Sequence, residues 1–423
     1  MTKKLGLVLT LVILFAFSSL YLAADPVEIT LWFHSGRGEE RDVLNDQVKR
    51  FNEMQDEVLI KAVQLPEGSY NDQVNSAALA GDLPDILDLD GPFIANYAWA
   101  GYLMPLEDFV PEDMKEDFLP SIIDQGTYDG HLYALGTFDS GLAFWGNKKY
   151  LEKVGARIPE SVDDAWTFIE FMDIVKKLQE LDEVKYALDF KLNYGVGEWY
   201  TYGFSPFFQA FGADLIDRTD FMSAEGVLNG PEALAAAAWF QSLFQRGFAN
   251  QNPPGDNEFI SGAAALSWVG HWVYNQYTNE LGDDLVLIPA PKFFKQATGM
   301  GSWAWSITSN CDNPEAAWKF LSFILRPEEI LKMTNANGAV PSRQSAYEMS
   351  ELYGEDGPLN IFVQQLESIA VARPVTPAYP TITAAFAQAL DNIINGSDIR
   401  DQLNRAVRQI DEDIEYNAGY TTD

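Results

Sequence analysis

The sequence has little of three kinds of residue on which many functional sites depend: cysteine, histidine and the basic residues. Cys311 is the one cysteine among 423 residues, which excludes an intrachain disulfide and a zinc site built on several cysteines. The three histidines, His34, His131 and His271, have no partner at a spacing typical of metal ligands. We therefore predict neither a metal ion nor a cofactor.

Positive charge is also scarce. The chain has 28 Lys+Arg against 62 Asp+Glu, and its formal net charge is −34. Nucleic acids and anionic lipid surfaces select basic patches, so neither is expected as a partner. Apolar residues nevertheless make up 47% of the chain. This excludes a disordered acidic protein, because disorder needs low hydrophobicity together with high charge. The length predicts two to three domain-sized units.

Motifs for nucleotide binding and for nucleophilic catalysis are missing. Gly36 and Gly38 form a GxG without a third glycine, and neither GxxxxGK[ST] nor GxSxG occurs. The sequence therefore predicts no catalytic residue. Carboxylates are so numerous, however, that a glycosidase pair can be neither named nor excluded. A secreted glycoside hydrolase thus stays open as an alternative.

The N-terminal segment has the layout of a secretory signal peptide. Residues 1–24 contain Lys3 and Lys4, an uncharged run and a closing pair of alanines, which predicts cleavage after Ala24. The alternative is an uncleaved anchor, because the apolar run is close to the length that spans a bilayer. No cysteine lies near the cleavage site, so we expect a periplasmic protein without a lipid anchor. Cleavage would take the net charge from −34 to −36.

Alternating strands and helices predict an α/β fold with a mostly parallel sheet. The expected elements of the first part are strands at 27–33, 58–63 and 84–89 and helices at 39–54 and 70–80. The expected strands further on are 132–135, 142–145, 263–269 and 285–288. The expected helices are one starting at Ser161 with Trp166, Ile169, Met172 and Val175 on one face, and those at 232–244, 314–325, 381–394 and 399–414.

Aromatic residues are plentiful, with 11 Trp, 18 Tyr and 27 Phe, and several tryptophans stand next to polar residues just past predicted strands. Examples are Trp145, Trp199, Trp272 and Trp303. Ligands of open α/β sheets bind beyond the carboxyl ends of the strands. A flat ring matches the apolar face of a sugar, and carboxylate, amide and guanidinium groups match its hydroxyls. The pattern indicates carbohydrate binding, with ordinary core packing of the tryptophans as the alternative.

Short motifs along the whole chain show a resemblance to a known family. They are GDLPDI at 81–86, YDGHLYAL at 128–135, GLAFWGNK at 141–148, FISGAAAL at 259–266 followed by Gly270-x-Trp272, NPEAAWKFL at 313–321 and VPSR at 340–343. Their order and spacing resemble the extracellular solute-binding proteins of ABC importers, family 1, the group typified by maltose-binding protein. At Trp145-Gly146 the chain departs from the family's aliphatic–Tyr pair.

The resemblance implies a periplasmic-binding-protein-like fold of two α/β lobes, joined by crossing strands, with the ligand cleft between them. Lobe 1 would comprise residues 25–136 plus 292–328, and lobe 2 residues 137–291 plus 329–423. The crossings would fall near Gly136–Phe138, Ala290–Lys292 and Arg326–Pro327.

The resemblance also implies a function. The protein would be the monomeric, non-enzymatic substrate-binding component of an ABC sugar importer. It would bind a di- or oligosaccharide and deliver it to permease subunits in the inner membrane. The same fold could instead bind a polyol or a polyol phosphate; the net charge opposes a phosphate, although a local arginine pair could override it.

Candidate ligand-binding residues follow from the motifs and from the aromatic placements. By resemblance, the Trp272 ring stacks on the sugar, whereas Arg37 and Glu39 could also form a plain solvated helix start. The full set is His34, Arg37, Glu39, Asp90, Phe138, Asp139, Trp145, Trp199, Trp272, Trp303, Arg373 and Tyr379.

Overall fold

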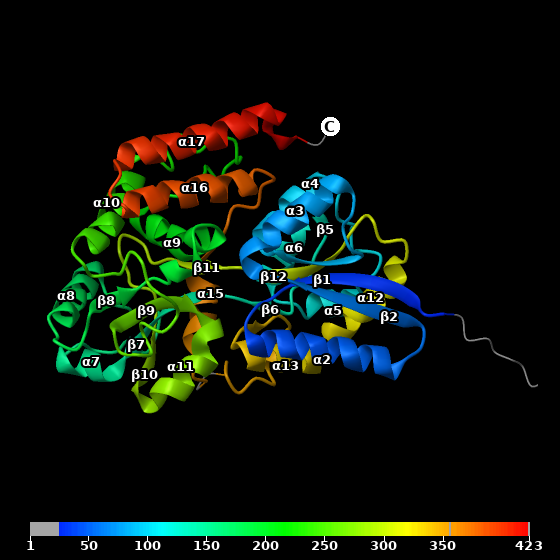
Figure 1. Cartoon of the computed structure of the whole chain (residues 1–423), viewed down its shortest axis with the longest axis horizontal. Helices are drawn as coiled ribbons and strands as arrows, with labels where there is room; N and C mark the ends of the chain where they lie inside the picture. The colour runs from blue at the N-terminus through cyan, green and yellow to red at the C-terminus, as the bar shows by residue number, and fades with distance from the viewer. Residues whose placement is uncertain (1–24, 355–356, 422–423) are drawn as a thin grey trace, which may run out of the picture.

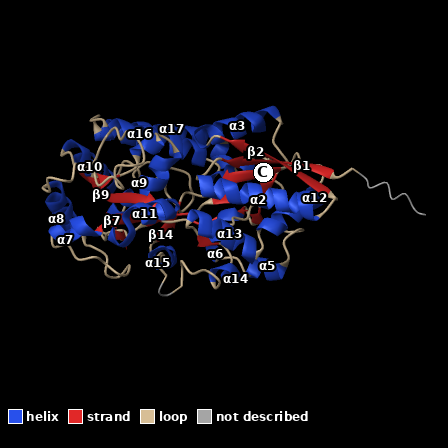
Figure 2. Cartoon of the chain, turned by 60° about the horizontal axis from the view of Figure 1, so that its bottom comes forward, coloured by secondary structure: helices blue, strands red, loops and turns tan. Residues whose placement is uncertain are grey.

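Two α/β lobes lie side by side, each built on a four-stranded sheet (Figure 1). The computed structural model describes residues 25–354 and 357–421. The strand order is β12-β3-β1-β2 in the first lobe and β10-β7-β9-β8 in the second. Figure 2 shows the strands enclosed by helices. This architecture confirms the predicted two-lobe α/β fold.

The first lobe holds the N-terminal strands. β1 pairs in parallel with β2 and β3, and β12 returns antiparallel to β3. Its elements are β1 (Val27–His34), α2 (Gly38–Met54), β2 (Val58–Leu65), α3 (Tyr70–Ala80), β3 (Ile86–Asp90), α4 (Ile94–Trp99), α5 (Glu112–Glu116), α6 (Pro120–Gly126), β4 (Thr127–Tyr128), β5 (His131–Leu132), β12 (Trp303–Ile307), α12 (Pro314–Ile324) and α13 (Pro327–Asn337).

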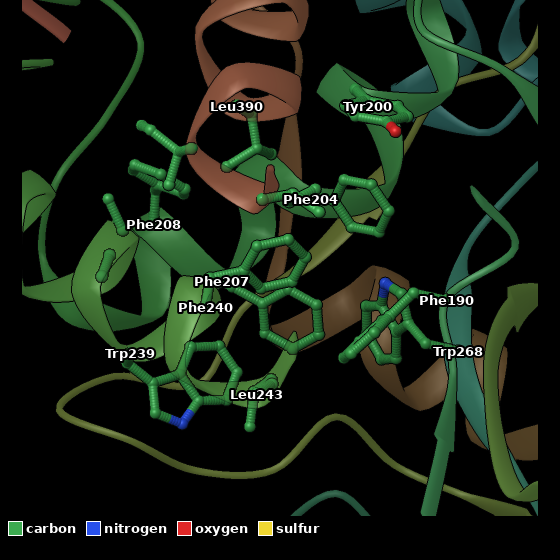
Figure 3. Close-up of a cluster of buried hydrophobic side chains, with 14 of the residues drawn as sticks. Phe190, Tyr200, Phe204, Phe207, Phe208, Trp239, Phe240, Leu243, Trp268 and Leu390 are labelled. Atoms are coloured by element: carbon green, nitrogen blue, oxygen red, sulfur yellow. The ribbon is translucent and has the colours of Figure 1, made fainter. Parts of the chain in front are cut away.

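The second lobe contains most of the aromatic core. Phe190, Phe204, Phe207, Phe240 and Trp268 interlock there between helices and sheet (Figure 3). Its elements are β7 (Leu142–Asn147), α7 (Lys148–Lys153), α8 (Phe168–Gln179), β8 (Tyr186–Asp189), α9 (Glu198–Phe211), α10 (Pro231–Gln245), β9 (Ala264–Gly270), α11 (Tyr274–Leu281), β10 (Leu285–Ile288), α15 (Asn360–Ser368), α16 (Tyr379–Ile394) and α17 (Ile399–Tyr416). In Figure 1, α16 and α17 run along one side of this lobe towards the first.

Short strand pairs lie where the chain passes between the lobes. β6 (Phe138–Asp139) pairs antiparallel with β13 (Val340–Pro341), and β11 (Thr298–Met300) pairs in parallel with β14 (Ala370–Ala372). The short helix α14 (Gln344–Tyr347) follows β13.

Two of the crossings differ from the predicted ones. Lys292 exchanges backbone hydrogen bonds with Trp166 and Phe168, and Phe293 packs on the second core, so the chain leaves the second lobe at β11 rather than near 290–292. Glu329 of α13 binds Arg50 of α2, and Met333 packs in the first core, so the crossing near 326–327 moves to β13. In both segments the chain stays packed in the lobe that it comes from for more residues than predicted, because apolar side chains are buried there.

The predicted start of one helix is wrong. α8 begins at Phe168, because Thr167 and Glu170 form a capping box in which each side chain accepts a hydrogen bond from the other residue's backbone N–H. Ser161 instead accepts a hydrogen bond from Asp164 N in a turn. Ile169 is predicted on the same apolar helix face as Met172 and Val175, but its side chain is 81% exposed.

The N-terminal prediction falls on residues 1–24, which lie outside the described residues. Across 25–354 and 357–421, the helices that are long enough to cross a bilayer are not apolar enough to do so.

Replacing Thr167 with alanine removes the cap of α8. We expect the Thr167→Ala variant to lose about 1 kcal/mol of unfolding free energy, measured by urea titration, since a cap of this type contributes that much. The matched control Ser161→Ala removes the hydroxyl at the alternative start and should cost less than about 0.5 kcal/mol. Equal losses in the two variants would contradict the assigned helix start.

Candidate functional site

One edge of the first sheet presents three residues to the junction between the lobes. His34 ends β1, Asp90 ends β3, and Trp303, which begins β12, is directly paired with Asp90. The His34 and Trp303 rings stack with their centroids 3.8 Å apart and their planes 10° apart. His34 Nδ1 donates to Asp88 Oδ2 at 2.5 Å, which fixes the orientation of the imidazole. A flat, half-buried ring face thus stands at the carboxyl ends of these strands.

The second lobe faces this edge with four aromatic rings, which we call the aromatic wall: Tyr194, Trp199, Tyr202 and Trp272. The Trp199 ring lies 5.1 Å from Tyr194 and 6.0 Å from Trp272, between centroids. Trp272 Nε1 donates to Tyr194 Oη at 3.2 Å, and Trp199 Nε1 donates to the Phe190 carbonyl. The wall is therefore rigid, because each indole is held both by a neighbouring ring and by a hydrogen bond.

Gly270, at the end of β9, lets the Trp272 ring lie against the backbone. A Cβ atom on Gly270 would stand 2.0 Å from Cζ3 of that ring, which is closer than two non-bonded carbon atoms can approach. Gly270 therefore sets where the indole lies, which explains the glycine two positions before the tryptophan.

Arg373 joins the two lobes by a buried ion cluster. Its guanidinium, 5% exposed, donates to both oxygens of Asp90 in the first lobe at 2.8 and 3.0 Å. It also donates to Oε1 of Glu198, the first residue of α9 in the second lobe, at 2.6 Å. Tyr379 and Thr383 donate to the same Glu198 carboxylate. Burial is the largest influence on this carboxyl and raises the pKa of Glu198, against the opposing effect of Arg373.

A second link between the lobes lies at Arg37. This arginine, between β1 and α2, donates to Asp256 Oδ2 at 2.9 Å and to Tyr194 Oη at 2.6 Å. Asp256 is in turn held by Lys191, whose ammonium is 1% exposed and lies 2.8 Å from Asp189. The aromatic wall is thereby connected through Tyr194 to the first lobe.

These contacts form a connected series across the interlobe junction. The Arg373 guanidinium lies 4.7 Å above the Tyr202 ring, which neighbours Trp272. The series runs from His34 through Trp303, Asp90, Arg373, Tyr202, Trp272 and Tyr194 to Arg37. It combines flat apolar faces with charged hydrogen-bonding groups from both lobes, a combination suited to a ligand with apolar faces and hydroxyl edges.

A cavity opens beside the first sheet at this junction. The residues that line it come from β1, α2, β3, the first crossing, β12 and α13: Phe33, His34, Glu40, Arg41, Leu44, Asp88, Thr137, Phe138, Trp303, Trp305 and Met333. In the part of the chain that is described, no group of three His, Cys, Asp or Glu side chains is arranged to hold a metal ion.

Most of the predicted residues meet at the junction. His34, Arg37, Asp90, Trp199, Trp272, Trp303 and Arg373 take part in the contacts above, and Tyr379 contributes through Glu198. Phe138 lines the cavity. Asp139 accepts hydrogen bonds from the backbone N–H groups of Ser140 and Gly301, at 2.7 and 3.1 Å, and so ties two crossings together. Burial raises the pKa of this carboxyl.

Two predicted residues lie away from the junction. Trp145 is 1% exposed and packs in the core among Tyr274, Tyr277 and Phe362, because β7 is flanked by strands on both sides. Trp145 therefore agrees with the alternative interpretation, in which the tryptophan packs in the core. Glu39 is exposed in the first turn of α2, as the solvated-helix-start alternative describes.

Four residues of the junction were missed by sequence reasoning. Tyr194 and Tyr202 flank Trp199 in an aromatic stretch, and this density could have indicated them. Glu198 adjoins Trp199 as well. Asp256 lies in an ordinary polar loop and carries no sequence signal; its partner Arg37 is 219 positions away.

Gly270→Ala should displace the Trp272 ring. We expect a clear change in the near-ultraviolet circular dichroism of the aromatic wall with an unchanged far-ultraviolet spectrum, because the added methyl group occupies the place of the ring. The control Gly68→Ala adds a methyl group with no atom within 4 Å and should leave both spectra unchanged. An unaltered near-ultraviolet spectrum in Gly270→Ala would refute the proposed role of this glycine.

His271 should make stability depend on pH. Its Nδ1 lies 2.8 Å from the Asn337 carbonyl oxygen, which can only accept, so Nδ1 carries the proton and Nε2 accepts from Ser140 Oγ at 3.0 Å. Burial lowers the pKa of His271 to about 4, below the ordinary 6.5. The unfolded chain therefore takes up a proton first, and stability falls as the pH drops from 6.5 to about 4.

The loss over this interval is about 3 kcal/mol for an imidazole with these two pKa values. The difference in unfolding free energy between pH 7 and pH 4 should shrink by about that amount in His271→Gln relative to the unmodified chain. The control His131→Gln alters a histidine that is 60% exposed and should change the difference far less. The same pH dependence in all three proteins would contradict the assignment.

Comparison with known proteins places this geometry in a family. The sequence model of the protein family described as "Bacterial extracellular solute-binding protein" matches residues 46–358 of this chain. The maltotriose-binding protein of Pyrococcus abyssi is 23% identical over 87% of this chain and 77% of its own length. The mannitol-binding protein of Pseudomonas aeruginosa is 25% identical over 79% of this chain and 77% of its own length.

A solved structure shares the fold. The GacH receptor of Streptomyces glaucescens, known unliganded and in complex with acarbose, has a TM-score of 0.78 at 21% identity and covers 93% of this chain and 98% of its own. The family match covers most of both lobes, whereas His34, Arg37, Arg373 and Tyr379 of the junction lie outside the matched residues. The chain belongs to the bacterial extracellular solute-binding protein family.

Proposed function

We propose that this protein is the substrate-binding component of an ABC importer and that its ligand is a saccharide, with a di- or oligosaccharide preferred. The observation that supports this most directly is the series of contacts across the junction, which brings together aromatic faces and charged hydrogen-bonding groups of both lobes. A pyranose ring has an apolar C–H face for an indole and hydroxyls for carboxylate and guanidinium groups.

Binding would work through closure of the lobes. Ligand contacts from both lobes favour the closed arrangement over the open one. Arg37 and Arg373 contact both lobes, so their ion pairs join the lobes in the arrangement of this structure. Closure removes water from the hydroxyl contacts, and a wrongly placed hydroxyl then leaves a polar group unpaired.

Delivery to a membrane permease completes the proposed role. The family is extracellular, in agreement with export directed by residues 1–24 and a location in the periplasm. The protein would act as a monomer and hand its ligand, chemically unchanged, to permease subunits in the inner membrane. Energy would come from ATP hydrolysis by partner subunits.

Absence of catalysis is part of the proposal. The carboxylates at the centre of the junction, Asp90 and Glu198, both bind the Arg373 guanidinium. A glycosidase needs one carboxyl to give a proton and another to act as base or nucleophile. Carboxylates held in a common ion cluster are poorly suited to either task, which disfavours the hydrolase alternative.

A polyol is the second candidate ligand, supported by the mannitol-binding relative. An acyclic polyol offers hydroxyls but no flat ring face. The aromatic wall and the His34–Trp303 stack therefore favour a cyclic sugar over it.

Ligand-dependent thermal stabilisation tests the function. Purified protein would be melted with maltose, maltotriose, mannobiose, mannotriose or mannitol, all at the same high concentration. A ligand present at about 100 times its dissociation constant stabilises the folded state by about 2.7 kcal/mol. We expect one of the oligosaccharides to raise the melting temperature by several degrees, and Trp272→Ala to reduce this rise.

The hydrolase alternative is tested in the same samples. Chromatography after long incubation should recover the sugar unchanged, and sustained cleavage would overturn the transport role. If neither the sugars nor mannitol stabilise the protein, the saccharide assignment fails.

A further inference from the structure

The cations at the interlobe junction are already engaged by carboxylates. Arg373 is bound by Asp90 and Glu198, and Lys191 by Asp189 and by Asp256. Arg37 shares that same Asp256. Three buried or half-buried cations thus face four carboxylates in these clusters alone.

Further carboxylates increase the negative excess. Asp88 binds His34, and Glu40 lies 3.8 Å from the same imidazole. Another cation, Arg41, lines the cavity, but its side chain is 38% exposed and lies next to Glu40 and Asp42. Water and these neighbouring carboxylates weaken the electrostatic attraction between the Arg41 guanidinium and an anionic ligand.

From this balance we infer that the junction selects saccharides by charge: it accepts neutral saccharides and those with a protonated amine, and it rejects acidic ones such as uronates, aldonates and sugar phosphates. The inference depends on the proposed saccharide function and makes its ligand class more specific. It also bears on the arginine pair named above: Arg37 is bound by Asp256, and both terminal nitrogens of Arg373 are bound by Asp90 and Glu198, so that only the buried Nε of Arg373 has no partner.

The physical reason is the cost of an unpaired buried charge. An anionic ligand could displace a carboxylate from a guanidinium, but the displaced carboxylate would then be buried without a cation. Otherwise the ligand's own charge would be buried without a cation. A protonated amine brings the opposite charge into a region with excess carboxylate oxygens and donates charge-assisted hydrogen bonds to them. A neutral hydroxyl also finds acceptors there without an electrostatic penalty.

A matched series of probes tests this inference by isothermal titration calorimetry. Maltotriose and mannotriose would each be used as the alditol, the 1-amino-1-deoxyalditol and the aldonate, which differ in charge at one end and share the remaining rings. We expect the aldonate of the better-binding sugar to bind about 100-fold more weakly than its alditol. The amine should bind at least as tightly as the alditol.

Two results would overturn the inference while leaving the saccharide function intact. One is an aldonate that binds within tenfold of its alditol, and the other is an amine that binds more weakly than the alditol. If none of the probes binds, and the parent sugars do not bind either, the proposed function itself fails and the inference fails with it.

A variant locates the effect in the ion clusters. Asp256→Asn keeps the shape of the side chain but removes one carboxylate from Arg37, so the ratio of alditol to aldonate affinity should fall at least threefold. The ratio is taken within one protein and cancels general losses of affinity. The control Glu39→Gln removes the same charge from an exposed position two residues from Arg37 and should leave the ratio unchanged. A lower ratio in both variants, or in neither, would count against the inference.

Discussion

The buried guanidinium of Arg373 is the interaction on which the arrangement of the two lobes depends most. It is 5% exposed and binds a carboxylate from each lobe. A charge removed from water is costly unless it is paired and hydrogen-bonded, so the cluster is stable only when Asp90 and Glu198 come together. The relative position of the lobes is thereby coupled to the pairing of a few charges, and the same residues border the place where a ligand would bind.

The aromatic residues serve two different purposes that sequence alone does not separate. Trp145 and Trp268 lie inside the second lobe, whereas Trp272 and Trp303 lie half-buried at strand ends. The difference is one of position along a strand. Trp145 is in the body of β7, with β9 and β10 hydrogen-bonded on its two sides, and a ring there can only face a helix layer. At the ends of strands the covering helices have ended, and a ring faces the other lobe.

The large negative charge also has a specific consequence at the junction between the lobes. Over the whole chain it argues only against polyanionic partners. Around the interlobe contacts, carboxylates bind Arg37, the terminal nitrogens of Arg373 and the buried ammonium of Lys191, so the proposed ligand region would be rich in hydrogen-bond acceptors. Acidity at this one place would be a property of the proposed ligand-binding surface, whereas acidity elsewhere concerns solubility and repulsion between copies.

The sequence by itself determined the two-lobe α/β fold, most strands and helices, and most of the residues that meet at the junction, through hydrophobic periodicity and ordered motifs. It did not determine the helix start at Thr167, where a capping box competes with an equally plausible serine, nor the crossings at β11 and β13. Nor did it pair Arg37 with Asp256, or Arg373 with Asp90 and Glu198. Charged pairs of this kind join positions up to 283 residues apart, and no local pattern encodes such a distance. Burial, strand register and the partners of each charge are decided only when the two lobes come together in three dimensions.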